Sequence, residues 1–223
     1  MNKLNHIAFI MDGNGRWGRK KNKNRNFGHY HGVQTVKKIV EASIKMKVPV
    51  ITFYVFSTEN WKRPKNEINF LFNLVGTYFR NELKNVIKNG IKINIIGELF
   101  KLPKKLNKML KETVIKTKNN KKIIVNLALN YGSKQEIVNV FKKIKKKNIS
   151  EKKINENLYT SKIPDPDILI RTGGRKRLSN FMLWQLAYSE LYFLDKLWPD
   201  FLPSDLKKII KDYNKITRNF GGI

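Results

Sequence analysis

Residues 7–17, Ile-Ala-Phe-Ile-Met-Asp-Gly-Asn-Gly-Arg-Trp, decide the fold, because an apolar run ends there in an acid and a glycine-rich turn. The apolar run is short and rich in β-forming residues, which predicts a strand buried on both faces. Asp12 then lies at the carboxyl end of this strand, where open α/β sheets bind their ligands. Gly13 and Gly15 let backbone N–H groups approach an anion closely, and Arg16 adds a guanidinium that matches phosphate oxygens. This combination favours a metal–phosphate site over a structural turn.

Length and composition predict a single globular domain. The chain has 223 residues, enough to bury about 70% of its unfolded surface, and 41% of them are hydrophobic. It contains no cysteine, which excludes disulfides, thiolate nucleophiles and zinc–thiolate sites. We expect no signal peptide, and the longest apolar run, Val48–Phe56, is far shorter than the roughly 20 residues of a spanning helix. These features predict a soluble, cytoplasmic protein.

The formal net charge of +29 is the strongest compositional bias of the chain. Most of the excess is lysine interleaved with asparagine and isoleucine, so the base composition of the coding DNA explains it equally well. A positive field of this size favours polyanions, diphosphates and anionic membrane surfaces alike. Charge by itself therefore does not choose among these partners.

Strand-like and helix-like segments alternate along the chain. We expect strands at Ile7–Met11, Pro49–Phe56, Ile91–Ile96, Ile123–Leu129, Asp167–Ile170 and Phe181–Trp184. We expect a basic loop over Arg16–His31, helices at 33–44, 66–88, Leu102–Lys118, Lys134–Lys147 and Pro203–Thr217, and a helical excursion with a loop over 148–163. The alternation predicts an α/β fold, one domain over residues 1–223 with a mostly parallel six-stranded sheet flanked by helices.

Polar segments directly follow four of these strands. They are Asp12–Trp17, Ser57–Arg63, Asn130–Gly132 and Arg171–Gly174. Because the carboxyl ends of parallel strands meet at one edge of a sheet, we expect the four segments to share one cleft.

Several nucleotide and calcium motifs are disfavoured. Residues 13–18 match G-x-G-x-x-G, but a dinucleotide fold needs a helix at once and an acid about 20 residues later. A basic loop is predicted here instead, and the next acid after Asp12 is Glu41. Arg16 occupies the place of the third oxygen ligand of a calcium loop. The sequence also contains no G-x-x-x-x-G-K-[ST], which disfavours a P-loop nucleotide hydrolase.

Arginine and hydroxyl side chains gather at the predicted edge. They are Arg16, Arg25, His29, Arg63, Arg171 and Arg177, with Ser57, Thr58 and Ser179. A guanidinium binds two phosphate oxygens at once. A lone arginine would be ordinary solvated surface, but six such cations exceed the needs of one diphosphate. The edge therefore predicts a diphosphate site that accepts two phosphorylated substrates.

Carboxylates number only 17, so their placement is informative. Asp12 closes the first strand, and Glu190 lies in the aromatic segment 184–193 as either a metal ligand or a buried ion-pair partner. Mg²⁺ usually takes one or two carboxylates together with phosphate oxygens and water, so it is the metal we expect. Glu59 and Glu67 suit helix capping or local pairing equally well.

Aromatic and aliphatic residues surround the same loops. They are Trp17, Phe27, Trp61, Phe70, Phe79 and the apolar face of the helix 66–88. The simpler interpretation is that these side chains pack in an ordinary hydrophobic core. A hydrophobic tunnel beside the sheet, next to a diphosphate site, would instead indicate a prenyl substrate.

The order and spacing of these motifs resemble the cis-prenyltransferases, and among them the bacterial undecaprenyl diphosphate synthases. The matching segments are Asp12–Trp17, Arg25–His29, Phe56–Pro64, Asp167–Gly174, Leu178–Phe181, Trp184–Phe193 and Trp198–Phe201. The resemblance covers essentially the whole chain, and the complete set is highly specific.

The resemblance implies a homodimer that condenses farnesyl diphosphate with successive isopentenyl diphosphates. The product would have Z double bonds, and we expect undecaprenyl diphosphate (C55) for the lipid carrier of cell-wall synthesis, delivered to the membrane. Asp12 would be the essential acid at the Mg²⁺–diphosphate, with Glu190 as a second metal ligand from the neighbouring subunit's side. Asn60 resembles the residue that assists proton removal, but an amide is a poor base, so we expect it to orient the reactants.

The resemblance also implies the residues that bind substrate. The allylic diphosphate would lie against Gly13, Asn14, Gly15, Arg16, Trp17, Arg25 and His29. Isopentenyl diphosphate would lie against Arg171, Arg177, Leu178 and Ser179. Both reactants would be positioned by Ser57, Thr58, Glu59, Asn60, Trp61 and Arg63.

The sequence departs from the bacterial pattern at Arg175 and Lys176, which stand where an acid and often a histidine occur. Two other classes stay open. A non-catalytic, dimer-forming relative is disfavoured because Asp12, Asn60 and Glu190 are retained. The hypothesis of a nucleic-acid-binding protein rests on the net charge alone, and we expect no nucleic-acid partner.

Overall fold

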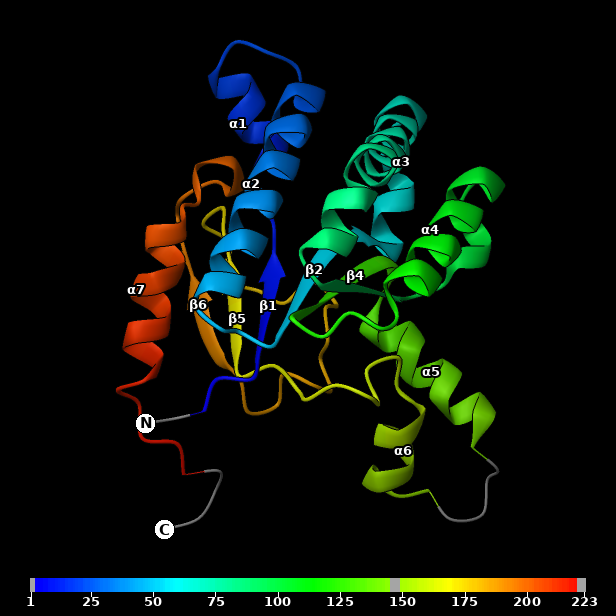
Figure 1. Ribbon diagram of the computed structural model, residues 1–223, viewed down its shortest axis with the longest axis vertical. Coiled ribbons are helices and arrows are strands. Elements are labelled where there is room, and N and C mark those ends of the chain that lie inside the picture. Colours follow the sequence, from blue (N-terminus) through cyan, green and yellow to red (C-terminus); the bar gives the residue numbers. More distant parts are fainter. Residues whose placement is uncertain (1–2, 145–148, 220–223) are drawn as a thin grey trace.

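One six-stranded sheet forms the centre of the computed structural model, which describes residues 3–144 and 149–219 (Figure 1). Its strands are β1 His6–Ile10, β2 Val50–Ser57, β3 Ile91–Ile96, β4 Ile123–Tyr131, β5 Ile168–Arg171 and β6 Glu190–Phe193. They lie in the order β3-β4-β2-β1-β5-β6, and every neighbouring pair is parallel. The predicted α/β class and six-stranded sheet are confirmed, with the sheet wholly parallel.

Helices connect the strands. The described residues form α1 Asn14–Lys20, α2 Arg25–Lys45, α3 Lys65–Lys88, α4 Lys104–Thr117, α5 Ser133–Lys143, α6 Glu151–Asn157 and α7 Pro203–Tyr213. Short 3-10 helices lie at Thr58–Lys62, Leu99–Lys101 and Trp198–Asp200. No helix in the described part of the chain is both long and apolar enough to cross a bilayer.

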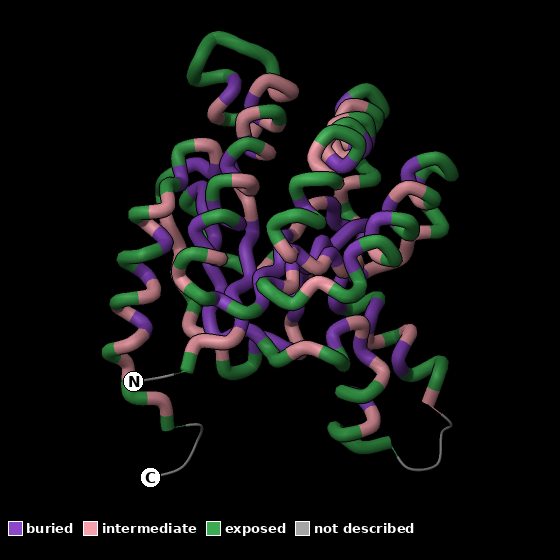
Figure 2. Tube along the Cα trace, viewed as in Figure 1, coloured by how far each residue is buried: buried purple, intermediate pink, exposed green. Residues whose placement is uncertain are grey.

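Both faces of the central strand β1 are buried (Figure 2). Ile7 and Phe9 belong to the larger core, which also holds residues of α2, α3, α4 and α7. Ala8 and Ile10 belong to a second, smaller core with Phe181 and neighbouring residues. This double burial explains why the strand reads as a continuous apolar run.

The predicted basic loop over Arg16–His31 is wrong, since most of it is helical, in α1 and the start of α2. Its glycines allow the two helices to touch through their backbones. A Cβ on Gly28 would lie 1.8 Å from the carbonyl oxygen of Asn14, and one on Gly18 would lie 2.3 Å from that of Asn24. The helix that the dinucleotide pattern requires is therefore present, and only the missing acid still argues against that class.

The predicted strand Phe181–Trp184 is also wrong. Ser179, Asn180 and Met182 have φ values of 51°, 62° and 45°, which no strand accommodates. The sixth strand is instead β6, which pairs with β5 from Glu190 onwards.

Several predicted helix ends differ from the observed ones. The last helix ends at Tyr213 and not at Thr217. The predicted helix Lys134–Lys147 corresponds to α5, and its last predicted residues, 145–147, lie outside the described residues.

Candidate active site

A polar cleft of about 610 Å³ lies at the carboxyl edge of the sheet, beyond β1, β2 and β5. Side chains from three of the four predicted segments line it, and Asn130–Gly132 lies beside them, with Asn130 bonded to Trp61. The lining residues with polar side chains are Asp12, Asn14, His29, Tyr54, Ser57, Glu59, Asn60, Arg63, Arg171, Arg177, Ser179 and Asn180. A smaller pocket of about 100 Å³ adjoins it and adds Gly13, Gly15, Arg16 and Arg25. Five arginines and only two carboxylates line the two spaces, so the combined site suits an anion.

Asp12 joins two arginines at the end of β1. Its Oδ2 accepts from Arg171 Nη2 at 3.0 Å, and its Oδ1 accepts from Arg16 Nη2 at 3.2 Å. Arg16 also donates to the carbonyl oxygen of Gly173 at 2.7 Å, and Thr172 Oγ1 donates to the carbonyl oxygen of Asp12 at 2.8 Å. These bonds hold the end of β1 against the end of β5.

Arg171 is the buried member of this group, with 4% of its side chain exposed. Its Nη1 donates to Ser179 Oγ at 2.8 Å and to the carbonyl oxygen of Arg177. Its Nε is buried without a hydrogen-bond partner in the described part of the chain. A buried guanidinium with unused hydrogen-bonding capacity is suited to an anionic ligand.

Glu67 of α3 gathers two arginines and one histidine that line the small pocket. Arg25 binds it through Nε and Nη2 at 2.9 and 3.0 Å, Arg63 Nη1 lies at 3.2 Å and His29 Nε2 at 3.3 Å. Burial alone would raise the pKa of Glu67, but the hydrogen bond and charge of Arg25, helped by Arg63, lower it overall. Glu67 therefore stays ionised and holds the guanidinium groups of Arg25 and Arg63 in the lining of the small pocket.

His29 is the uncharged member of that cluster. Burial lowers its pKa, the nearby Glu67 carboxylate opposes this shift, and Arg63 and Arg25 reinforce it. At neutral pH the imidazole is therefore neutral and available as a hydrogen-bonding group.

The turn after β2 holds Asn60 and Glu59 in fixed positions. The N–H of Ser57 donates to Asn60 Oδ1 at 3.1 Å, which caps the 3-10 helix that follows β2. Glu59 Oε1 accepts from Asn180 Nδ2 at 2.8 Å; burial raises the pKa of Glu59, but this hydrogen bond and others lower it overall. The side-chain carbonyl of Asn60 is thus engaged with backbone, and its orienting role stays a prediction.

Four predicted site residues are not among those that line the cleft and the small pocket. Trp17 stacks on Phe27 and donates to Asp200 at 2.7 Å, while Trp61 donates to Asn130 at 2.7 Å. Leu178 packs against the second core, and Thr58 lies against Gly132. Their contacts support the walls of the cleft without lining it.

Glu190 does not reach Asp12 within one chain. It opens β6 opposite Ile168, which pairs with Ile7, so it lies at the amino edge of the sheet. The five residues from Ile7 to Asp12 correspond to about 16 Å at the usual rise of a strand. Its nearest cation there is Arg218, with Nε 3.9 Å from Oε1. A shared metal site of Asp12 and Glu190 would require two chains.

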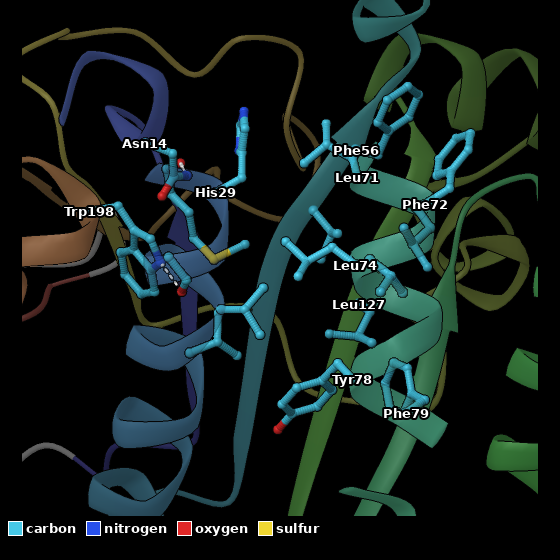
Figure 3. A pocket seen from close by; sticks show the side chains of 17 residues that line it. Asn14, His29, Phe56, Leu71, Phe72, Leu74, Tyr78, Phe79, Leu127 and Trp198 are labelled. Atoms are coloured by element: carbon cyan, nitrogen blue, oxygen red, sulfur yellow. Dashed lines mark hydrogen bonds between the residues drawn. The ribbon is translucent and has the colours of Figure 1, made fainter. Parts of the chain in front are cut away.

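An apolar pocket continues from the polar cleft between α2 and α3 (Figure 3). Its volume is about 110 Å³, and Met11, Asn14, His29, Val55 and Leu71 line both spaces. Figure 3 shows Leu71, Leu74 and Tyr78 of α3 on one wall, with His29 and Trp198 on the other.

The apolar pocket uses part of the surface that was predicted to line a tunnel, and the tunnel itself stays a prediction. Of the predicted wall residues, Phe79 and the face of α3 contribute, whereas Trp17, Phe27, Trp61 and Phe70 do not.

Sequence reasoning missed the central role of Glu67 and the part played by Asn180. The sequence left open whether Glu67 caps a helix or forms local ion pairs. In the structure it forms ion pairs with Arg25 and Arg63. Its spacing from Arg63, i to i+4, was the available signal. Asn180 could not be found, because its contact with Glu59 crosses 121 residues.

Known proteins are similar to this chain over nearly its whole length. The family profile described as "Putative undecaprenyl diphosphate synthase" matches residues 10–221. An isoprenyl transferase of Prochlorococcus marinus subsp. pastoris is 48% identical, over 98% of this chain and 84% of that protein.

Two solved structures are similar throughout. Lavandulyl diphosphate synthase from Lavandula x intermedia, in complex with dimethylallyl diphosphate, has a TM-score of 0.93 and 31% identity, covering 97% of this chain and 98% of that one. A probable undecaprenyl diphosphate synthase from Campylobacter jejuni has a TM-score of 0.85 and 36% identity, covering 99% and 100%.

Proposed function

This chain belongs to the undecaprenyl diphosphate synthase family of isoprenyl transferases, and from that premise we propose that it adds successive isopentenyl diphosphates to farnesyl diphosphate. The product is a Z-polyprenyl diphosphate, undecaprenyl diphosphate (C55), for the lipid carrier of cell-wall synthesis. One observation carries the proposal: the cation-rich cleft opens directly onto the apolar pocket, and Asn14 and His29 line both. A diphosphate joined to a hydrocarbon tail has the same two-part chemistry.

The allylic diphosphate occupies the small pocket beside Asp12. The backbone of Gly13, Asn14 and Gly15 approaches the diphosphate closely. The side chains of Arg16, Arg25 and His29 supply hydrogen-bond donors. Its hydrocarbon tail extends past Met11 and Val55 into the apolar pocket. Isopentenyl diphosphate binds Arg171, Arg177 and Ser179 across the cleft, beside Ser57 and Asn60.

The reaction breaks the allylic C1–O bond and forms a new C–C bond. Negative charge develops on the leaving diphosphate, and the preorganised guanidinium groups of Arg16 and Arg25 stabilise it. The isopentenyl double bond attacks C1, and loss of a C2 proton to the released diphosphate or to water forms the new alkene. Fixing both diphosphates aligns the reacting carbons and removes much of the entropic barrier. Asn60 and Arg63 orient the reactants.

The donor set fits a magnesium ion that is held partly by substrate. No group of three His, Asp or Glu side chains with metal-binding geometry occurs in the described ranges 3–144 and 149–219. Mg²⁺ usually takes one or two carboxylates and completes its shell with phosphate oxygens and water, so Asp12 would hold it. When bound, the ion neutralises charge on the leaving diphosphate.

A homodimer is part of the same proposal. In one chain Glu190 lies on the edge strand β6, with Leu191 45% exposed beside it. An edge strand with exposed apolar side chains is suited to pairing with a second copy. We place the enzyme in the cytoplasm, with its product passed to the membrane.

Incubation with farnesyl diphosphate, labelled isopentenyl diphosphate and Mg²⁺, followed by sizing of the extracted products, tests the proposal. The expected result is a ladder that ends near C55. A different end point would correct the chain length, whereas no incorporation by folded protein would refute the activity.

A further inference from the structure

A second groove lies outside the catalytic cleft, between α3 and α4, which pack side by side (Figure 1). It has a volume of about 310 Å³. Its floor includes Gly76, Leu106 and Met109, and its rim carries Arg80, Lys105 and Lys108. The three cations are exposed, and Glu112 is the acid among the lining residues. An apolar floor below a cationic rim suits an amphiphile with an anionic head.

The outer face of α4 extends this basic surface. The helix has five lysines and one glutamate, and Ile115 on it is 63% exposed. Phe100, just before the helix, is 71% exposed, with Lys101 Nζ 5.9 Å from its ring centre. Exposed apolar side chains among lysines are typical of surfaces that dock on anionic bilayers.

We propose that the α3–α4 groove and the basic outer face of α4 dock the protein on an anionic lipid bilayer. The cationic rim matches anionic headgroups, and Phe100 and Ile115 enter the interface. A nucleic acid would use the charge but not the apolar floor. α4 lies at the β3 edge of the sheet, so this surface is open to a flat partner.

The surface also lies close to the apolar pocket. Phe72 of α3 lines both the pocket and the α3–α4 groove. The pocket is therefore separated from the docking groove by one side chain, so docking would bring it near a bilayer that could receive an apolar product. Only this last purpose of docking rests on the proposed function.

Co-sedimentation with lipid vesicles tests the proposal. The probes are vesicles of phosphatidylcholine alone and vesicles in which a third of the lipid is phosphatidylglycerol. The test variant combines Arg80→Gln, Lys105→Gln and Lys108→Gln. The matched control combines Lys207→Gln, Lys208→Gln and Lys211→Gln on α7, at the other end of the sheet (Figure 1). Both variants lower the net charge from +29 to +26 (29 − 3).

We expect wild type and the α7 control to bind the anionic vesicles and the rim variant to bind about a hundredfold more weakly. Each cation near such a surface contributes about 1 kcal/mol, and 1.4 kcal/mol corresponds to tenfold. Phe100→Ser is expected to weaken vesicle binding while leaving binding to duplex DNA unchanged.

Three results would overturn the proposal. Equal losses in the rim and α7 variants would mean that only the global charge matters. Equal binding to both kinds of vesicle would remove the role of anionic headgroups. A rim variant that loses duplex DNA binding but keeps vesicle binding would indicate a nucleic-acid surface. The assay contains no prenyl diphosphate, so it is independent of prenyl transfer, and thermal melting checks that each variant is folded.

Discussion

Arg171 and Asp12 form an ion pair between two neighbouring strands, with Nη2 and Oδ2 3.0 Å apart across 159 residues of sequence. The pair is unequal, because 4% of the Arg171 side chain and 30% of the Asp12 side chain are exposed. Loss of Asp12 leaves a buried guanidinium without its carboxylate. Loss of Arg171 leaves a carboxylate that water can reach.

Asp12→Asn is therefore expected to affect both activity and stability. The rate of prenyl transfer should fall by about 10²–10³, as for other groups that stabilise transition-state charge. The free energy of unfolding should fall by about 1–3 kcal/mol, because a buried charged donor loses its partner. Initial rates and urea unfolding measure the two effects. Arg16→Gln removes the exposed partner of Asp12 and should cost less than about 1 kcal/mol of stability. Full activity in Asp12→Asn would contradict the proposed role.

Glu67→Gln should lower thermal stability and increase the stabilisation that inorganic diphosphate provides. Without the carboxylate, Arg25 and Arg63 repel each other in the empty site, and an added anion relieves this repulsion. The measurement is the shift of the melting temperature on adding diphosphate, in variant and wild type. Glu82→Gln, on the same helix and paired with Lys37 at 3.0 Å, is the matched control and should leave that shift unchanged. A smaller shift in Glu67→Gln than in wild type would show that Glu67 does not set the spacing of the arginines.

His6 is expected to make stability depend on pH between about 6.5 and 4. Burial lowers its pKa from the usual 6.5 to about 4, and its ring nitrogens bond to the carbonyl oxygen of Pro164 and to Thr52 Oγ1, each at 2.7 Å. In this window the unfolded chain binds a proton that the native protein does not, so stability is lost as the pH falls. The loss approaches about 3 kcal/mol.

Urea unfolding of wild type and His6→Gln at a series of pH values measures this dependence. Acidic side chains contribute to both proteins, so the difference between the two curves isolates His6. Parallel curves would mean that His6 does not control this part of the acid sensitivity.

Val36→Phe should shorten the product ladder. Val36 of α2 lines the apolar pocket, and a larger side chain there fills space that the growing chain needs. The first condensation should proceed at nearly the normal rate, because the diphosphate sites are unchanged. Val138→Phe, at an exposed position of α5, is the control. An unaltered ladder from Val36→Phe would mean that the chain grows elsewhere.

The local pattern of the sequence predicted five of the six strands and most of the residues that line the cleft. Apolar runs such as Ile7–Met11 predict buried strands because both faces of a parallel sheet are covered. The polar residues after them then fall at one edge by geometry alone, which is why Asp12, Ser57 and Arg171 were predicted together and lie together. The motif set also identified the family.

Other features depended on contacts that no local pattern encodes. The helix α1 forms because Gly18 and Gly28 admit backbone contacts, although glycine by itself disfavours helix. The positive φ of Met182 excludes the predicted strand Phe181–Trp184, despite its apolar residues.

The sequence by itself determined the first five strands, most of the helices, the family, and the chemical type of each site residue, because these follow from local periodicity and motif spacing. Only the tertiary structure decided which of these residues meet. It brought three partners to Glu67, bonded Trp17 to Asp200 and Trp61 to Asn130 outside the cleft lining, and placed Glu190 at the opposite edge from Asp12. The physical reason is that packing across distant segments fixes side-chain positions, and burial there sets charge and pKa.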